Sequence, residues 1–93
     1  MSIREIINEK DTTFVDVRTG MEFNMGHVEG AINIPLDQFA VRYQEIKDLG
    51  EKPVVFYCRS GARSGQAVAF LNNMGIKKIY NGGGMDDLLI YLN

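Results

Sequence analysis

The sequence predicts an α/β fold in which helices pack on a central, mostly parallel sheet of about four strands. Short helical patterns alternate with runs of β-branched and aromatic residues, and this alternation is typical of parallel α/β architectures. The run Pro53–Tyr57 (PVVFY) does not alternate polar and apolar residues, so we expect a strand that is buried on both faces. No linker interrupts the 93 residues, and residues 1–93 are predicted to form one domain.

The first half of the chain is predicted to contain three helices and two strands. Ser2 and Glu5 have the spacing of a capping box, and Thr19 and Glu22 repeat that spacing. The expected elements are a helix from Ile3 to about Lys10, a strand at Thr13–Val17, a short helix between Thr19 and Gly26, a strand at Ala31–Ile34 and a helix at Asp37–Asp48.

The second half is predicted to contain two strands, two helices and one turn. The turn prediction depends on three consecutive glycines, which can adopt backbone angles that other residues avoid. The expected elements are a strand at Pro53–Tyr57, a helix at Ser64–Asn73, a strand at Lys77–Tyr80, a turn at Asn81–Gly84 and a helix at Met85–Leu92.

The composition argues against several classes of function. Because the net charge is −2 and no basic block is present, nucleic acid is not an expected partner. The single cysteine cannot form an internal disulfide, and no cysteine–histidine cluster offers a metal site. The N-terminal segment has no apolar signal core, and no segment reaches the roughly 20 apolar residues that span a bilayer. We therefore expect a cytoplasmic protein with no membrane partner.

The loop from Cys58 to Arg63 (CRSGAR) is the most informative stretch, because it leaves the predicted buried strand and leads into a helix. Ligands of parallel sheets bind beyond the carboxyl ends of the strands. Backbone N–H groups at the start of a helix are free to bind an anion, and Arg59 and Arg63 add two positive charges. These features favour the thiolate of Cys58, so we predict a lowered pKa and a nucleophilic role. A buried, inert thiol is the alternative, but it would not need these neighbours.

The segments FVDVRTGMEFNMGHVEGAINIPL, VVFYCRSGARSGQAVAFLNNMG and YNGGG cover most of the chain from Phe14 to Gly84. In this order they closely resemble the single-domain rhodanese-like sulfurtransferases. The resemblance implies the rhodanese fold, a three-layer α/β/α sandwich, and no metal or organic cofactor. It implies that Cys58 takes a sulfane sulfur from a small anionic donor such as thiosulfate, becomes a persulfide, and passes the sulfur to cyanide or a thiol, including a protein thiol. The substrate-binding residues that it implies are Arg59, Ser60, Gly61, Ala62 and Arg63.

The chain departs from the pattern of this family in two places. The family usually begins with a short strand, whereas here a helix starts almost at Met1, so four strands rather than five are expected. The tryptophan that often follows the glycine turn in the family is missing, because the chain contains no tryptophan. The sequence therefore predicts neither the shape of the pocket rim at Gly82–Asp87 nor the identity of the sulfur acceptor.

Asp16 and Arg18 end the first predicted strand, at the same edge of the sheet as Cys58. We expect Asp16 to orient the Cys58 loop by accepting hydrogen bonds, and Arg18 to pair with Glu22 or another carboxylate. His27 is the only histidine in the chain, and we expect a structural role for it because nothing in the sequence brings it near Cys58.

Two other interpretations of the loop are open at this point. Cysteine phosphatases and arsenate reductases also use a cysteine loop, but with five residues between the cysteine and the arginine, where this chain has four. A binding module that carries a persulfide to a partner protein would also keep Cys58.

Overall fold

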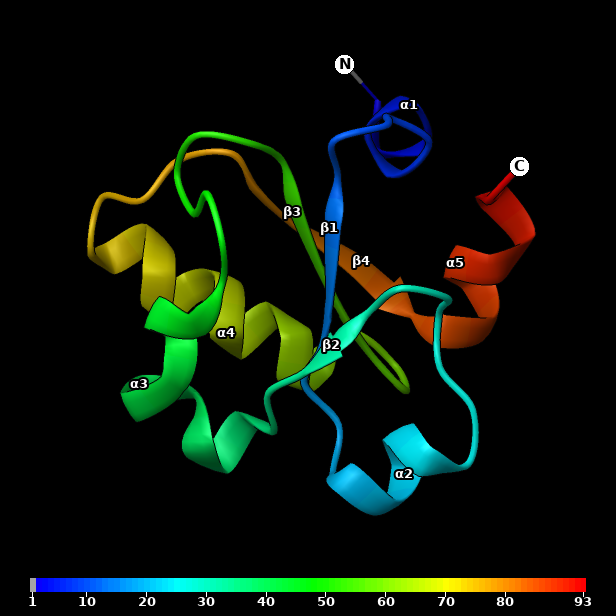
Figure 1. Cartoon of the computed structure of the whole chain (residues 1–93), viewed down its shortest axis with the longest axis horizontal. Coiled ribbons are helices and arrows are strands. Elements are labelled where there is room, and N and C mark those ends of the chain that lie inside the picture. Colours follow the sequence, from blue (N-terminus) through cyan, green and yellow to red (C-terminus); the bar gives the residue numbers. More distant parts are fainter. Residues whose placement is uncertain (1) are drawn as a thin grey trace.

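A computed structural model describes residues 2–93, and within them the sheet has four strands (Figure 1). The strands are β1 (Thr13–Asp16), β2 (Ile32–Asn33), β3 (Val54–Cys58) and β4 (Ile79–Gly84). Their spatial order is β2-β1-β3-β4, and all three pairings are parallel. The predicted four-stranded sheet is therefore confirmed.

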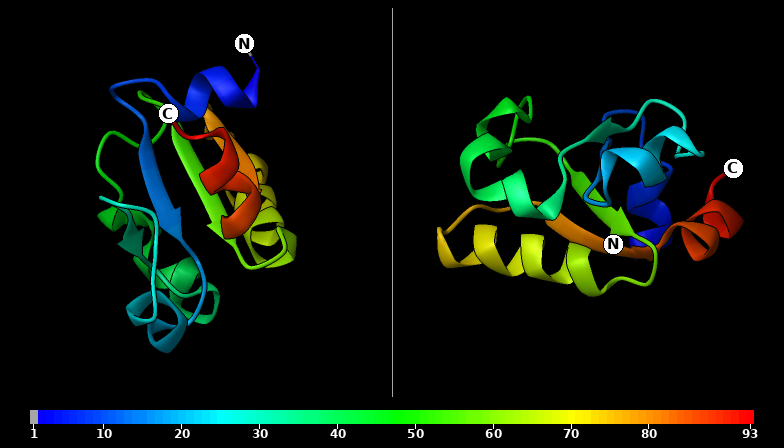
Figure 2. Two further views of the ribbon diagram at one scale, coloured as in Figure 1. Left: turned by 90° about the vertical axis from the view of Figure 1, so that its right-hand side faces the viewer. Right: turned by 90° about the horizontal axis from the view of Figure 1, so that it is seen from below.

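Helices cover both faces of this sheet. The helical elements in the described residues are α1 (Ile3–Ile7), α2 (Gly20–Asn24), η1 (Leu36–Gln38), α3 (Phe39–Arg42), η2 (Tyr43–Glu45), α4 (Ala62–Asn73) and α5 (Met85–Tyr91), of which η1 and η2 are short 3-10 helices. α3 and α4 pack on one face and α1 and α5 on the other (Figures 1 and 2), which gives the predicted three-layer α/β/α arrangement. Among residues 2–93, no helix combines the length and the apolar character needed to cross a membrane.

β3 is the central element because it belongs to both apolar cores. Its side chains alternate between the two faces: Val54, Phe56 and Cys58 lie in the core under α3 and α4, and Val55 and Tyr57 lie in the core under α1 and α5. All five residues of β3 are buried, as the unbroken apolar run predicted.

Both predicted capping boxes are present. The Ser2 hydroxyl accepts the Glu5 N–H, the Thr19 hydroxyl accepts the Glu22 N–H, and each glutamate accepts a hydrogen bond from the backbone N–H of its capping residue. α1 ends earlier than predicted because Asn8 caps it, with its side-chain amide donating to a carbonyl of the last turn.

The prediction of one continuous helix at Asp37–Asp48 is wrong. Gln38 and Arg42 have φ angles of −107° and −118°, far from the helical value of about −63°, and they divide the segment into η1, α3 and η2. The Phe39 ring packs edge-on against two other phenylalanine rings of the core. Tertiary contacts of this kind override helix propensity.

The prediction of a turn at Asn81–Gly84 is also wrong, because this segment completes β4. Its pairing with β3 passes from Asn81 directly to Gly83, so Gly82 forms a β-bulge. A Cβ atom at Gly82 would lie 2.7 Å from a methyl group of Val55. Gly82 is therefore needed for close packing, whereas Gly83, with a φ of +82°, supplies the unusual backbone angle that was predicted for this run.

Candidate functional site

Cys58 is the last residue of β3 and lies at the carboxyl end of the sheet, with 1% of its surface exposed. The chain then turns into α4 at Gly61, which has a φ of +98° and stands at the N-cap. Glycine adopts this left-handed conformation without strain. The loop Cys58–Arg63 thus has the predicted position, and α4 begins at Ala62, earlier than predicted.

A backbone N–H and a hydroxyl group contact the sulfur of Cys58. The Gly61 N–H donates to Sγ at 3.0 Å, and the Ser64 hydroxyl oxygen lies 3.5 Å from Sγ. Burial raises the pKa of Cys58, but the Ser64 hydroxyl and the N–H groups of Ser64, Ser60 and Gly61 outweigh it and lower the pKa to about 7. The predicted direction of the pKa shift is confirmed, whereas the contribution of Ser64 was missed because a serine inside a helix carries no particular signal.

The rate of Cys58 alkylation is therefore expected to rise with pH and to level off above an inflection near pH 7. The thiolate is the reactive form, and it predominates only above the pKa. Intact-mass measurement of iodoacetamide labelling over a pH series gives this profile, with a small free thiol, whose pKa is about 8.5, as the control. An inflection at the pH of the free thiol would show that the loop does not activate Cys58.

Asn81 of β4 makes one hydrogen bond to the loop, one to the first turn of α4 and one within its own strand. Its Oδ1 accepts from the Ser64 hydroxyl at 2.7 Å and from the Gly83 N–H at 2.9 Å. Its Nδ2 donates to the Gly61 carbonyl at 3.1 Å. Asn81 therefore positions both groups that contact the Cys58 sulfur. Asn81 is not among the predicted site residues, because its segment was predicted to be a turn.

The loop also lies directly against the backbone of β4. A Cβ atom at Gly84 would lie 2.5 Å from the carbonyl oxygen of Arg59, and one at Gly61 would lie 3.2 Å from the Cα of Gly83. Real Cβ atoms do not approach other atoms as closely as 2.5 Å. The absence of side chains at Gly84 and Gly61 is thus what lets the loop lie this close to β4.

Arg63 forms a two-pronged ion pair with Glu22 of α2. Its Nη1 and Nη2 donate to the two carboxylate oxygens at 2.8 and 3.1 Å. The Thr19 N–H and hydroxyl donate to the same carboxylate. The hydrogen bonds from Arg63, followed by those from Thr19, lower the pKa of Glu22 to about 2, so Glu22 is ionised at neutral pH. One of the two predicted donor-binding arginines therefore already has a carboxylate partner.

Arg18 pairs with a carboxylate, as predicted, and the partner is Asp16. Its Nε and Nη2 donate to Asp16 Oδ2 at 3.0 and 2.6 Å, and Nη2 also donates to the Gly26 carbonyl. The backbone N–H of Arg18 donates to Asp16 Oδ1. In the part of the chain that the structure describes, no hydrogen bond joins the Asp16 side chain to the Cys58 loop, contrary to the expectation that it orients the loop. Both carboxylate oxygens of Asp16 accept hydrogen bonds from Arg18 instead.

His27 makes local contacts at the end of α2. Its ring stacks on that of Phe23 with the centroids 3.6 Å apart, and its Nδ1 is hydrogen-bonded to the Phe23 carbonyl at 2.8 Å. These contacts agree with the structural role predicted for His27.

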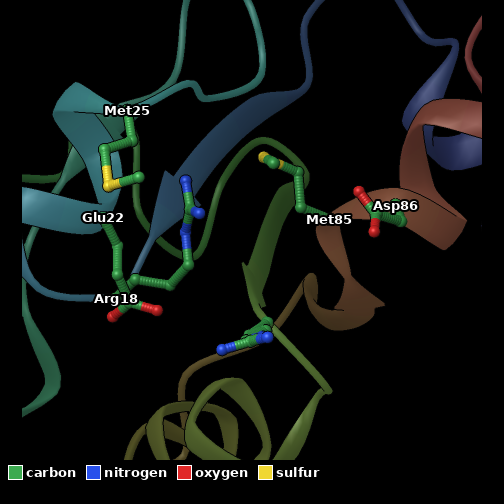
Figure 3. A pocket seen from close by; sticks show the side chains of 6 residues that line it. Arg18, Glu22, Met25, Met85 and Asp86 are labelled. Carbon is green, nitrogen blue, oxygen red and sulfur yellow. The ribbon is translucent and has the colours of Figure 1, made fainter.

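A pocket of about 330 Å³ lies beside the loop, between α2 and the start of α5 (Figure 3). Its lining residues are Arg18, Glu22, Met25, Arg59, Met85 and Asp86. Met25 and Met85 approach it from opposite sides, with the Arg18 guanidinium between them (Figure 3). The rim Gly82–Asp87 thus contributes a methionine and a carboxylate to the pocket. Within residues 2–93, no three histidine, cysteine or acidic side chains gather into a possible metal site.

Comparison with known proteins places these features in one family. The sequence model of the Rhodanese-like domain matches residues 2–88. Among solved structures, the chain is similar to a rhodanese with anions from E. coli, with 37% identity and a TM-score of 0.75, over 82% of this chain and 89% of that one. It is also similar to a NAD-dependent persulfide reductase from A. fulgidus, with 32% identity and a TM-score of 0.67, over 85% of this chain and 14% of that one.

Curated relatives include longer proteins. The chain is 35% identical over 83 residues to the tRNA uridine(34) hydroxylase of Yersinia pestis (strain Pestoides F), which covers 85% of this chain and 23% of that protein. It is 46% identical over 67 residues to the uncharacterized protein YqhL of Bacillus subtilis (strain 168), which covers 72% of this chain and 52% of that protein. The chain therefore spans about a quarter of the first relative and about half of the second.

Proposed function

Because this chain belongs to the rhodanese-like domain family, we propose that it is a sulfurtransferase with Cys58 as its nucleophile. In this proposal Cys58 takes a sulfane sulfur from thiosulfate or a similar donor, holds it as a persulfide and passes it to a thiophilic acceptor such as cyanide or a thiol. The observation that carries the proposal is the environment of Sγ, where the Gly61 N–H donates at 3.0 Å and the pKa of the thiol is about 7.

In the first step the Cys58 thiolate attacks the outer sulfur of thiosulfate. A bond forms between Sγ and this sulfur, the S–S bond of thiosulfate breaks, and sulfite leaves with the bonding electron pair. No proton has to move, which suits a loop that contains no His, Asp or Glu. The backbone N–H groups of Ser60, Gly61 and Ala62 are the proposed donors that hold the transferred sulfur.

In the second step the acceptor attacks the outer sulfur of the persulfide. The S–S bond of the persulfide breaks, its electron pair returns to Cys58 as the thiolate, and the acceptor leaves as thiocyanate or as a new persulfide. A thiol with a pKa of about 7 is a better leaving group than an ordinary cysteine, whose pKa is about 8.5.

Intact-mass measurement after thiosulfate treatment tests this function. We expect the mass of one added sulfur atom, which is lost again on treatment with cyanide. If no sulfur is added by thiosulfate or by a persulfide donor, the proposal fails. An aryl phosphate assayed in parallel should release no phosphate, because four residues between Cys58 and Arg63 leave less room for a phosphoryl group than the five of cysteine phosphatases.

Arg59→Ala is expected to raise the KM for thiosulfate by about 10- to 100-fold with little change in kcat, because a charge-assisted hydrogen bond contributes roughly 1.5–3 kcal/mol. Arg63→Ala is expected to raise KM and also to lower kcat, because it removes the ion pair with Glu22 that holds the start of α4 to α2. Steady-state kinetics with thiosulfate and cyanide separates the two effects. An unchanged KM in both variants contradicts a donor-binding role.

A persulfide relay to a partner protein is the second candidate function. It is favoured by the observation that the similar segments make up only 23% of a tRNA uridine(34) hydroxylase and 14% of a persulfide reductase. The relay predicts faster sulfur transfer from the persulfide of Cys58 to a protein thiol than to an equal concentration of a small thiol. Equal rates would favour the reaction with small acceptors.

A further inference from the structure

The charges around the pocket cancel. Its six lining residues include two arginines, Arg18 and Arg59, and two carboxylates, Glu22 and Asp86. Arg18 is in addition paired with the buried carboxylate of Asp16. Thiosulfate carries two negative charges, but the residues that line the pocket offer no excess of positive charge to attract it.

The ion pair between Arg63 and Glu22 affects the binding of a dianionic donor most directly. Both Nη groups of Arg63 donate to Glu22, so a sulfonate group can bind them only by displacing the carboxylate. The displaced carboxylate would stay close to the sulfonate, because the Thr19 N–H and hydroxyl hold it at the start of α2. Like charges at such a distance repel, and a dianion is repelled more than a monoanion or a neutral molecule.

We propose that Glu22 is a specificity residue that disfavours dianionic donors, and that the donor class of this site is an organic persulfide whose carbon group carries at most one charge. This inference rests on the proposed sulfur transfer through Cys58. Met25, with 83% of its surface exposed, and Met85 supply apolar and polarisable surface for the carbon group on opposite sides of the pocket (Figure 3).

The transfer from such a donor balances without an added oxidant or reductant. The Cys58 thiolate attacks the terminal sulfur of R–S–SH, a bond forms between Sγ and that sulfur, and the S–S bond of the donor breaks. The electron pair leaves on R–S⁻, and the proton stays on the transferred sulfur as Cys58–S–SH. That proton is then released to water.

Glu22→Gln separates the charge of this residue from its other role. Glutamine also serves at the third position of a capping box, so the hydrogen bonds from Thr19, and with them α2, are retained. We expect the KM for thiosulfate to fall about tenfold, since Arg63 no longer has an anionic partner. The KM for 2-hydroxyethyl persulfide, whose carbon group carries no charge, should change much less. Rates of sulfur addition to Cys58, followed by intact mass, give both values.

Two further variants control this result. Glu45→Gln removes a similar ion pair, with Arg42, in a segment outside the pocket, and it should leave both KM values unchanged. In an Arg63→Ala background, Glu22→Gln should improve thiosulfate use less than in the native chain, because it removes only the repulsion and releases no guanidinium. Melting temperatures of all variants show whether they are folded.

The outcomes separate the inference from the function on which it rests. If both donors add sulfur to Cys58 but Glu22→Gln leaves the KM for thiosulfate unchanged, the specificity role is wrong and the sulfurtransferase proposal stands. A fall in KM that is undiminished in the Arg63→Ala background also overturns the inference, since Glu22 would then not act by occupying Arg63. If neither donor adds sulfur, the proposed function itself fails.

Discussion

Cys58→Ser is expected to abolish transfer of sulfur from thiosulfate to cyanide. Cys58 is the only thiol of the chain, and a serine hydroxyl stays protonated at neutral pH, so it cannot attack the outer sulfur of the donor. The fold should persist because the substitution is nearly isosteric. The Gly61 N–H and the Ser64 hydroxyl, which now contact the sulfur, can make hydrogen bonds to the serine oxygen.

Three measurements on Cys58→Ser test whether Cys58 is the nucleophile. Turnover should be lost, intact mass should show no added sulfur after treatment with either donor, and the melting temperature should stay close to that of the native chain. Substantial residual turnover in a folded Cys58→Ser protein would falsify the assignment of the nucleophile.

Gly84→Ala is expected to reduce sulfur transfer about 100-fold, although Gly84 has no side chain that could take part in the reaction. The new Cβ atom would lie 2.5 Å from the carbonyl oxygen of Arg59, so the loop has to move away from β4. A displacement of about 1 Å in a reacting group can cost on the order of 100-fold in rate. This movement should also displace the N–H groups that contact the Cys58 sulfur. The inflection in the rate of Cys58 alkylation should therefore shift to higher pH.

Gly83→Ala is the matched control for this variant. Gly83 has a φ of +82°, so alanine there is strained by roughly 1–2 kcal/mol, but its Cβ atom would meet nothing within 4 Å. We expect Gly83→Ala to lose stability and keep its activity per folded molecule, whereas Gly84→Ala, at a φ of −82°, should lose activity. Equal activity in the two variants would show that the close approach of β4 does not position the loop.

The parts of the site that are continuous in sequence could be predicted from it. The apolar run before Cys58, the glycine that follows it and the helical pattern beyond specify strand, turn and helix through local rules. The four-stranded parallel sheet followed in the same way from the alternation of elements. The lowered pKa of Cys58 followed from its position at the start of a helix.

The contacts that complete the site depend on residues far apart in sequence. Glu22 and Arg63 are 41 positions apart, and Ser64 and Asn81 are 17 apart. Local patterns do not show which carboxylate an arginine will meet. From the sequence alone, Arg63 is therefore expected to be free to bind a donor, and Glu22 is expected only to cap a helix or to pair with Arg18.

The glycine run of β4 shows a second limit. Glycine is selected both where the backbone needs a positive φ and where another segment approaches too closely for a Cβ atom. Sequence alone does not distinguish the two cases. Here Gly84 serves the second purpose, since its φ is −82°.

The burial of β3 on both faces also determines where the molecule can open. All of its five residues are buried in the two cores, so exposing the backbone of Cys58 to exchange with solvent requires an opening close to global unfolding. α2 has no buried residue, and it is held by its cap and by the ion pair between Glu22 and Arg63. The free energy needed to open it locally is therefore expected to be low. Amide hydrogens of α2 therefore exchange long before those of β3, and the entrance to the site can rearrange around a bound molecule while the nucleophile stays fixed.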